Sequence, residues 1–133
     1  MLDNTVIIHV LQEQYPNLLA IYLFGSFAQG QAQQDSDVDL AVLVDDAKLD
    51  SLKLWENAQT LAIKLGRDVD LVDLHQASTV LQYQIIQYGQ RLWAKNDYAD
   101  EYELFILNEK LKFDELRQAQ LQDIQQRGYV YAK

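Results

Sequence analysis

A glycine–serine pair follows the first strongly apolar run of the chain. Residues 18–24 are rich in Leu, Ile, Tyr and Phe, which favours a β-strand, and Gly25-Ser26 comes directly after them. A strand that turns into a helix at this point exposes free backbone N–H groups, which favour an anion. Glycine lets a phosphate approach the backbone closely, and the Ser26 hydroxyl can donate one more hydrogen bond to it. The pair therefore predicts a phosphate-binding turn.

Three aspartates stand at the start of, or within, later apolar runs. Asp37 and Asp39 are two residues apart at the start of a strand, so their side chains point to the same face. Two such carboxylates repel each other unless a cation lies between them, and Mg²⁺ prefers oxygen ligands together with substrate phosphates. Asp70 lies between Val69 and Leu71, where a carboxylate is rarely placed for stability. On a neighbouring strand it could face the same metals or accept a proton from an attacking hydroxyl.

Together these groups match the requirements of nucleotidyl transfer. Two cations about 4 Å apart would clamp the attacking and leaving oxygens while the protein holds the triphosphate in line. An isolated Asp-x-Asp or Gly-Ser is a common strand-end or loop feature and carries little information. The ordered combination of strand, Gly-Ser, ten residues and Asp-x-Asp opening a buried strand is far more specific.

The elements that must position these residues follow from periodicity. We expect strands at residues 18–24, 38–44, 69–74 and 91–93, and helices at 3–14, 46–65, 77–88 and 97–127. The run 38–44 is almost wholly apolar and β-branched, which favours a strand buried on both faces near the sheet centre. Residues 29–36 form a loop or a short helix with a loop behind it. The predicted fold is a small α/β (α+β) domain, a mixed sheet flanked by helices with a long C-terminal helix.

Composition narrows the class of protein. A chain of 133 residues that is 49% hydrophobic corresponds to one globular domain. It has no cysteine, no visible secretory signal and no run long enough for a membrane span, so we expect a cytoplasmic protein. The net charge of −9 disfavours nonspecific binding of nucleic acid. It suits either a basic protein partner or simple solvation.

The motif Gly25-Ser26-x10-Asp37-x-Asp39 resembles the signature of the DNA polymerase β-like nucleotidyltransferase superfamily. The small size and the segment 68–74 look like its minimal nucleotidyltransferase (MNT) branch, and most closely like the antitoxins of HEPN/MNT toxin–antitoxin pairs. The resemblance covers residues 18–93 and implies a minimal nucleotidyltransferase domain over residues 1–95. Residues 96–133 would be a C-terminal helix and tail, packed on the same domain or on a partner.

The resemblance also implies an activity. Such antitoxins use ATP and Mg²⁺ to transfer AMP onto a tyrosine of a HEPN-domain ribonuclease, which silences that toxin. By position, Gly25 and Ser26 would hold the triphosphate, and Asp37 and Asp39 would hold the magnesium ions. Asp70 would be the third carboxylate.

Two neighbouring aspartates compete for that third role. Asp68 shares the face of Asp70 but lies at the start of the strand, and Asp73 falls on the opposite face, so Asp70 is preferred.

A few other residues carry open expectations. Many relatives have a basic residue where this chain has Gln29, so phosphate binding would depend more on backbone N–H groups and metal. The cations that could compensate are Lys64, Arg67 and Arg91. Among the tyrosines, Tyr129 and Tyr131 in the tail are the candidates for self-modification. His9 is expected to be a packed or surface residue. His75 follows the third strand near the proposed site and is a weaker candidate for nucleotide contact.

Two other functions fit parts of the sequence. The first is a small-molecule nucleotidyltransferase of the aminoglycoside-modifying type, although the residues after Trp93 are too few for the helical region that shapes its acceptor pocket. The second is an antitoxin that neutralises its partner by binding alone.

Overall fold

The computed structural model describes residues 2–46 and 48–127. The tail tyrosines Tyr129 and Tyr131 lie outside the described residues.

In the part of the chain that the structure describes, four strands form one mixed sheet. They are β1 (Leu18–Phe24), β2 (Val38–Val44), β3 (Val69–Asp73) and β4 (Gln90–Ala94), in the spatial order β3-β2-β1-β4. β1 pairs antiparallel with both β2 and β4, whereas β2 and β3 are parallel. The predicted position of residues 38–44 as a central, doubly buried strand is confirmed. The strand predicted at residues 91–93 is present as β4 and lies at one edge of the sheet.

Within the described residues, four α-helices and one short 3-10 helix surround the sheet. They are α1 (Asn4–Gln14), α2 (Ser51–Leu65), α3 (Thr79–Tyr88), α4 (Tyr98–Arg127) and the 3-10 turn η1 (Leu74–Gln76). Side chains cap three of the helix starts: Asp3 caps α1, Asp50 caps α2 and Ser78 caps α3. The predicted start of the second helix at Asp46 is wrong, because the Asp50 carboxylate accepts the N–H of Leu52 and begins the helix there.

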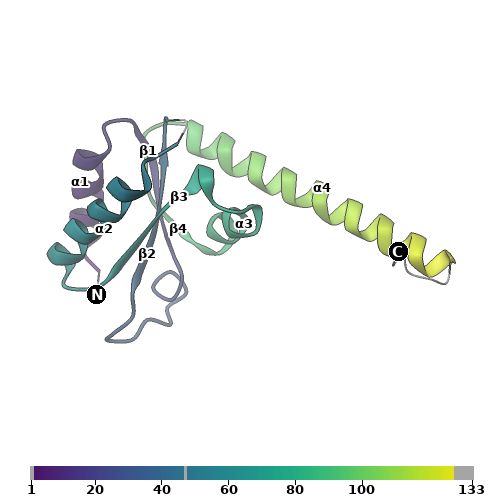
Figure 1. Cartoon of the computed structure of the whole chain (residues 1–133), viewed down its shortest axis with the longest axis horizontal. Helices are drawn as coiled ribbons and strands as arrows, with labels where there is room; N and C mark the ends of the chain where they lie inside the picture. The colour runs from purple at the N-terminus through teal and green to yellow at the C-terminus, as the bar shows by residue number, and fades with distance from the viewer. Residues whose placement is uncertain (1, 47, 128–133) are drawn as a thin grey trace.

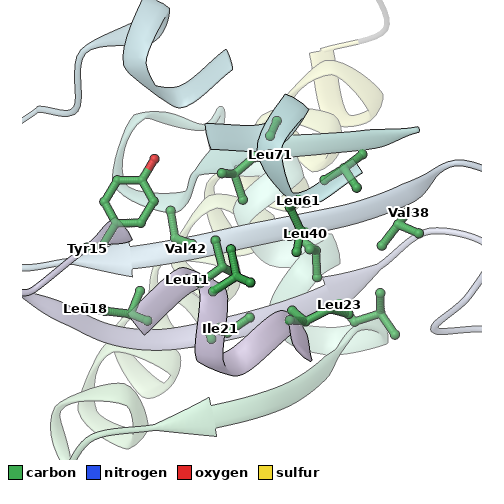
Figure 2. Close-up of a cluster of buried hydrophobic side chains, with 14 of the residues drawn as sticks. Leu11, Tyr15, Leu18, Ile21, Leu23, Val38, Leu40, Val42, Leu61 and Leu71 are labelled. Carbon is green, nitrogen blue, oxygen red and sulfur yellow. The ribbon is translucent and has the colours of Figure 1, made fainter. Parts of the chain in front are cut away.

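Two apolar clusters hold the helices on opposite faces of the sheet. α1 and α2 cover one face, and α3 and the first part of α4 cover the other (Figure 1). Figure 2 shows the first cluster, in which Leu11 of α1 and Leu61 of α2 pack against Leu40 and Val42 of β2. Leu52 and Trp55 of α2 lie outside this cluster and are more than 60% exposed.

The long helix α4 is anchored at its start and extends away from the sheet (Figure 1). Ala99, Tyr102 and Ile106 lie on one helical face and are buried in the second cluster. The Tyr22 hydroxyl donates to Glu103 at 2.7 Å, and Arg91 contacts the same carboxylate at 2.8 Å. Further along, exposed apolar residues are spread around the helix; they are Leu111, Phe113, Leu116 and Leu121.

The fold class predicted from the sequence, a mixed sheet flanked by helices with a long C-terminal helix, is confirmed. Among the described residues, no helix combines the length and apolar character that a bilayer crossing requires.

Candidate active site

The strands that carry the aspartates are parallel neighbours in the sheet. In the register of β2 and β3, Asp39 lies directly opposite Asp70. Paired positions of a parallel ladder point to the same face, so the two carboxylates project side by side. Asp37, two residues before Asp39, is close enough for its charge to act on Asp39. The structure thus brings together the three aspartates that the sequence singled out.

The electrostatics of Asp39 reflect this crowding. Burial of the side chain raises the pKa of Asp39 above its ordinary value, and the negative charges of Asp70 and Asp37 raise it further. A carboxylate in this position is held ionised at an energetic cost, which a cation beside it would remove. Carboxylate oxygens are the donor set that Mg²⁺ prefers.

The three side chains are not yet arranged around a common point. In the described part of the chain, no group of three or more acidic, histidine or cysteine side chains is positioned to hold a metal ion as it stands. The carboxylate donors fit a magnesium site, and the side chains would have to turn toward one another to hold the ion.

Gly25 brings the end of β1 against Asp39. Phe24 pairs with Asp39 across the antiparallel ladder, and Gly25 follows with φ of +73°. A Cβ atom added at Gly25 would collide with the Oδ2 atom of Asp39. Glycine is therefore required here both by the left-handed backbone and by the close approach of the carboxylate.

The segment after Gly25 is a single tight turn, so the predicted transition into a helix is wrong. Gln29 N–H donates to the Gly25 carbonyl at 3.2 Å, and Gln31 N–H donates to the Ser26 carbonyl at 2.9 Å. Gly30, with φ of +71°, makes this closing bond possible and ends the turn before a second one forms. Predicted loop residues 29–36 are confirmed as loop. Backbone N–H groups in a turn of this kind can still form an anion-binding concavity.

A cleft of about 220 Å³ opens beside Gly25 and Asp39. Its lining comes from the end of β1, from Asp39, from the turn and from α3, and consists of Phe24, Gly25, Gln29, Asp39, Leu81, Gln84, Tyr88 and Gly89. Sequence reasoning missed the α3 wall. The signal available was the spacing of Leu81, Gln84 and Tyr88, which places them on one helical face, but nothing in that spacing indicates what the face meets.

The two rival aspartates have other environments. Asp73 is only 7% exposed and lies on the opposite face of the sheet, where its carboxylate accepts the N–H groups of Leu49 at 3.3 Å and His75 at 3.2 Å. Asp68 precedes β3 and lines a separate groove with Asp35 and Arg67. Both positions favour Asp70 as the third carboxylate.

Two of the three proposed compensating cations, Arg67 and Arg91, are engaged elsewhere. The Arg67 guanidinium donates to the Gln34 carbonyl at 2.7 Å and lies 5.0 Å from the centre of the Phe27 ring, so it braces the loop. Arg91 pairs with Asp100 and Glu103 at the base of α4. Lys64 lies exposed near the end of α2. Gln29 itself lines the cleft.

Both histidines make contacts away from the residues that line the cleft. His9 is exposed and contacts Glu13 at 2.7 Å, as expected for a surface residue. The His75 ring meets Tyr102 edge-on at 5.3 Å, a packing contact between η1 and α4.

The fold and the site define a nucleotidyltransferase. The chain belongs to the polymerase beta nucleotidyltransferase family, whose model matches residues 6–98. It is similar to the protein adenylyltransferase MntA of Shewanella oneidensis, with 50% identity over 92 residues. That match covers 69% of this chain and 66% of the length of MntA, so the chain spans just under two thirds of that relative.

Two solved structures extend the comparison. A chain in a crystal structure of a toxin–antitoxin with AMP-PNP is 40% identical, with a TM-score of 0.82, and the match covers 93% of this chain and 99% of that one. A chain in a complex of a tri-AMPylated Shewanella oneidensis HEPN toxin with its MNT antitoxin is 38% identical, with a TM-score of 0.74. That match covers 92% of this chain and 95% of the other. The resemblance predicted from the sequence is confirmed.

Proposed function

We propose that this chain transfers AMP from ATP onto a tyrosine of a cognate HEPN-domain ribonuclease toxin and thereby neutralises it. The observation that carries the proposal is Asp39, which lies against Gly25 and opposite Asp70 in the β2–β3 ladder, in a chain half identical to a protein adenylyltransferase over the matched region. Because a ribonuclease partner must meet cellular RNA, we place the pair in the cytoplasm.

Each site residue has a distinct task in this reaction. The backbone N–H groups of Gly25 and Ser26 and the Ser26 hydroxyl hold the triphosphate of ATP. Asp37 and Asp39 hold Mg²⁺, and Asp70 is the third carboxylate, placed to accept the proton of the attacking hydroxyl. Bound Mg²⁺ supplies charge stabilisation for the α-phosphoryl group as it is transferred. The raised pKa of Asp39 supports this role, because crowded carboxylates gain most from a cation.

The acceptor comes from a partner protein. After β4 the described chain continues as one helix, and most of that helix extends beyond the sheet (Figure 1). No residue of α4 is among those that line the cleft. This arrangement disfavours the small-molecule alternative, which needs a helical region around its acceptor pocket. The accumulated exposed apolar area of α4 suits a protein surface instead, because six of its large apolar side chains are more than half exposed; they are Leu104, Phe105, Leu111, Phe113, Leu116 and Leu121.

Neutralisation by binding alone remains the second candidate, favoured by the same exposed surface of α4. The two candidates separate in one experiment. The partner, expected to be encoded by the neighbouring gene, is mixed with this chain, ATP and Mg²⁺, and its intact mass and ribonuclease activity are followed. Transfer predicts a mass gain of one or more AMP units and loss of ribonuclease activity.

The doubly substituted Asp37→Asn, Asp39→Asn chain provides the comparison. We expect it to bind the partner with unchanged affinity, to add no AMP and to leave the ribonuclease active once the complex is diluted. Full neutralisation by this variant, with no change in partner mass, would establish the binding-only function.

A further inference from the structure

A second groove lies between α3 and α4, next to the catalytic cleft. It has a volume of about 300 Å³, at the lower end of the size of small-molecule sites. Val80, Tyr83 and Tyr88 of α3 line one side, and Lys110 and Phe113 of α4 line the other. Val80, Tyr88 and Phe113 are each more than half exposed, so the groove is open to a ligand.

The groove is lined by aromatic side chains and by one positively charged side chain, Lys110. The Tyr83 and Tyr88 rings meet at 90° with centres 6.5 Å apart. The Lys110 ammonium lies 5.2 Å from the centre of the Tyr83 ring and 5.9 Å from that of Phe113. It also bonds Asp114 at 3.0 Å, which uses one of its three donors. Aromatic faces beside a lysine are the combination that binds a nucleobase by stacking and its phosphate by charge.

The groove and the catalytic cleft share a wall. Gln84 and Tyr88 line both the cleft and the groove. In the cleft they lie with Gly25 and Asp39, and in the groove they lie with Lys110 and Phe113. A ligand in the groove is thus adjacent to the point where AMP is transferred. The groove therefore suits a group that is covalently attached to the acceptor near its reacting hydroxyl. It suits a separate effector molecule less well.

We propose that this groove binds the AMP unit already attached to the acceptor while the next unit is added. The inference rests on the proposed function, since it concerns repeated transfer at the same site. A tyrosine has a single phenolic oxygen, so a second AMP on that tyrosine must join a ribose hydroxyl of the first. The relative found in complex with a tri-AMPylated toxin makes repeated transfer the case to explain.

The bond changes of the second transfer are the same as those of the first. The ribose hydroxyl oxygen of the attached AMP forms a bond to the α-phosphorus of ATP. The bond from that phosphorus to the oxygen bridging to the β-phosphorus breaks, and pyrophosphate leaves with the electron pair. The hydroxyl proton passes to Asp70. Stacking of the attached adenine on the exposed ring of Tyr88 or Phe113 would keep this AMP unit beside the wall that the groove shares with the catalytic cleft.

The test is the distribution of products on the partner, measured as intact mass over time with wild-type chain and with two variants, Lys110→Ala and Phe113→Ala. Both side chains lie at the surface of α4, so the variants are expected to fold. The partner is held at a concentration that saturates every variant, so that a weaker contact between α4 and the partner does not limit the rate. Under this condition we expect the first AMP to be added at the wild-type rate and the second at least about tenfold more slowly, as loss of one stacking ring or phosphate contact implies.

Matched controls come from the same helix. Lys112→Ala removes a lysine that contacts only Glu109 among the described ion pairs, at 3.7 Å, and Phe105→Ala removes a ring with the same 57% exposure as Phe113. Both controls should give the wild-type distribution of products.

Three results would overturn the inference. They are an unchanged distribution in both groove variants, an equal slowing of the first and later additions, and peptide mapping that places each AMP on a different tyrosine. Failure of the proposed function looks different, because the wild-type chain would then add no AMP at all.

Discussion

Asp39 occupies the centre of the site because three groups converge on it. Gly25 gives it room, Asp70 lies opposite it across the parallel ladder, and Asp37 adds a further negative charge. Substitutions at Gly25 and at Asp39 therefore test separately the backbone geometry and the electrostatics of this carboxylate.

The geometric test is Gly25→Ala. We expect this change to reduce AMP transfer at least about 100-fold, because displacement of the Asp39 carboxylate disturbs positioned charge at the reacting centre. It should also cost about 1–2 kcal/mol of folding free energy, because the backbone is left-handed there.

Gly30→Ala is the matched control, since Gly30 has nearly the same φ but no atom within 4 Å of an added Cβ. It should show a similar loss of stability in chemical denaturation with transfer largely retained. Equal losses of transfer in the two variants would mean that backbone strain, and not the contact with Asp39, explains the requirement for glycine.

The electrostatic test is the pH dependence of Asp39→Asn. A raised pKa means that the folded chain binds a proton at Asp39 more tightly than the unfolded chain, so stability falls as pH rises from the ordinary value of 3.8 through the folded value. In chelator at neutral pH, Asp39→Asn should therefore melt at a higher temperature than the wild type. The difference should vanish below pH 3.8.

Mg²⁺ should reverse that order at neutral pH. At a concentration of one hundred times its dissociation constant, the ion would stabilise the wild type by about 2.7 kcal/mol, and Asp39→Asn would gain much less. Melting curves by differential scanning calorimetry provide both comparisons. If Mg²⁺ raises the melting temperature of the two chains equally, the ion does not bind at these aspartates.

The five-residue strand β3 carries two aspartates with different roles. Asp70 belongs to the proposed catalytic site, and Asp73 stabilises the fold. Asp70 projects beside Asp39, whereas Asp73 on the other face caps η1 and holds the backbone of Leu49 before α2. The two carboxylates are close in the sequence but act through different contacts, which makes them a natural pair of variants.

We expect Asp70→Asn to abolish transfer with little change in melting temperature. Asp73→Asn should lower the stability by about 1–2 kcal/mol, because buried N–H groups lose a charged acceptor, and should retain transfer in the folded protein. Urea denaturation and initial rates of AMP transfer distinguish the two effects. Retained transfer in Asp70→Asn would remove Asp70 from the site.

The elements could be predicted where local chemistry decides them. β1 and β2 end at the predicted residues because apolar runs stop at Gly25 and at Asp45. The start of α2 was missed because several acidic residues can cap a helix, and only the structure identifies Asp50 as the one that does. The turn after Ser26 was missed because its length depends on Gly30 and on its contacts, not on periodicity.

The site itself was only partly accessible from the sequence. Gly25, Ser26 and the three aspartates could be singled out because spacing and strand register are local rules. The α3 wall of the cleft could not, because helix packing decides which residues face Asp39, and no pattern in residues 77–88 specifies the partner surface.

At the scale of the whole molecule, α4 joins two functions in one helix. Its first turns complete the second apolar cluster, and its later turns expose apolar residues away from the sheet (Figure 1). Leu111 and Leu116 are 60% and 67% exposed, and at 100° per residue they lie on different sides of the helix. We infer that the toxin contacts α4 from more than one side.

Combined substitution of Leu111→Ser and Leu116→Ser tests that surface. The isolated chain should keep its melting temperature within about 2 °C, since both side chains are exposed and substitutions there change stability by less than about 0.5 kcal/mol. Affinity for the partner, measured by calorimetry, should fall at least about tenfold. Gln118→Ser is the control on the same helix, and an unchanged affinity in the leucine variant would move the interface elsewhere.

The proposed reaction passes AMP, and not a phosphate, from ATP to a tyrosine of the partner. ATP labelled at the α-phosphate or, separately, at the γ-phosphate distinguishes the two when it is incubated with this chain, Mg²⁺ and the cognate HEPN protein. We expect the α-label to accumulate on a partner tyrosine and the γ-label to leave as pyrophosphate, and we expect the Asp37→Asn, Asp39→Asn chain to transfer neither. Transfer of the γ-label, or an unlabelled partner beside intact ATP, would mean that this chain is not an adenylyltransferase for that partner.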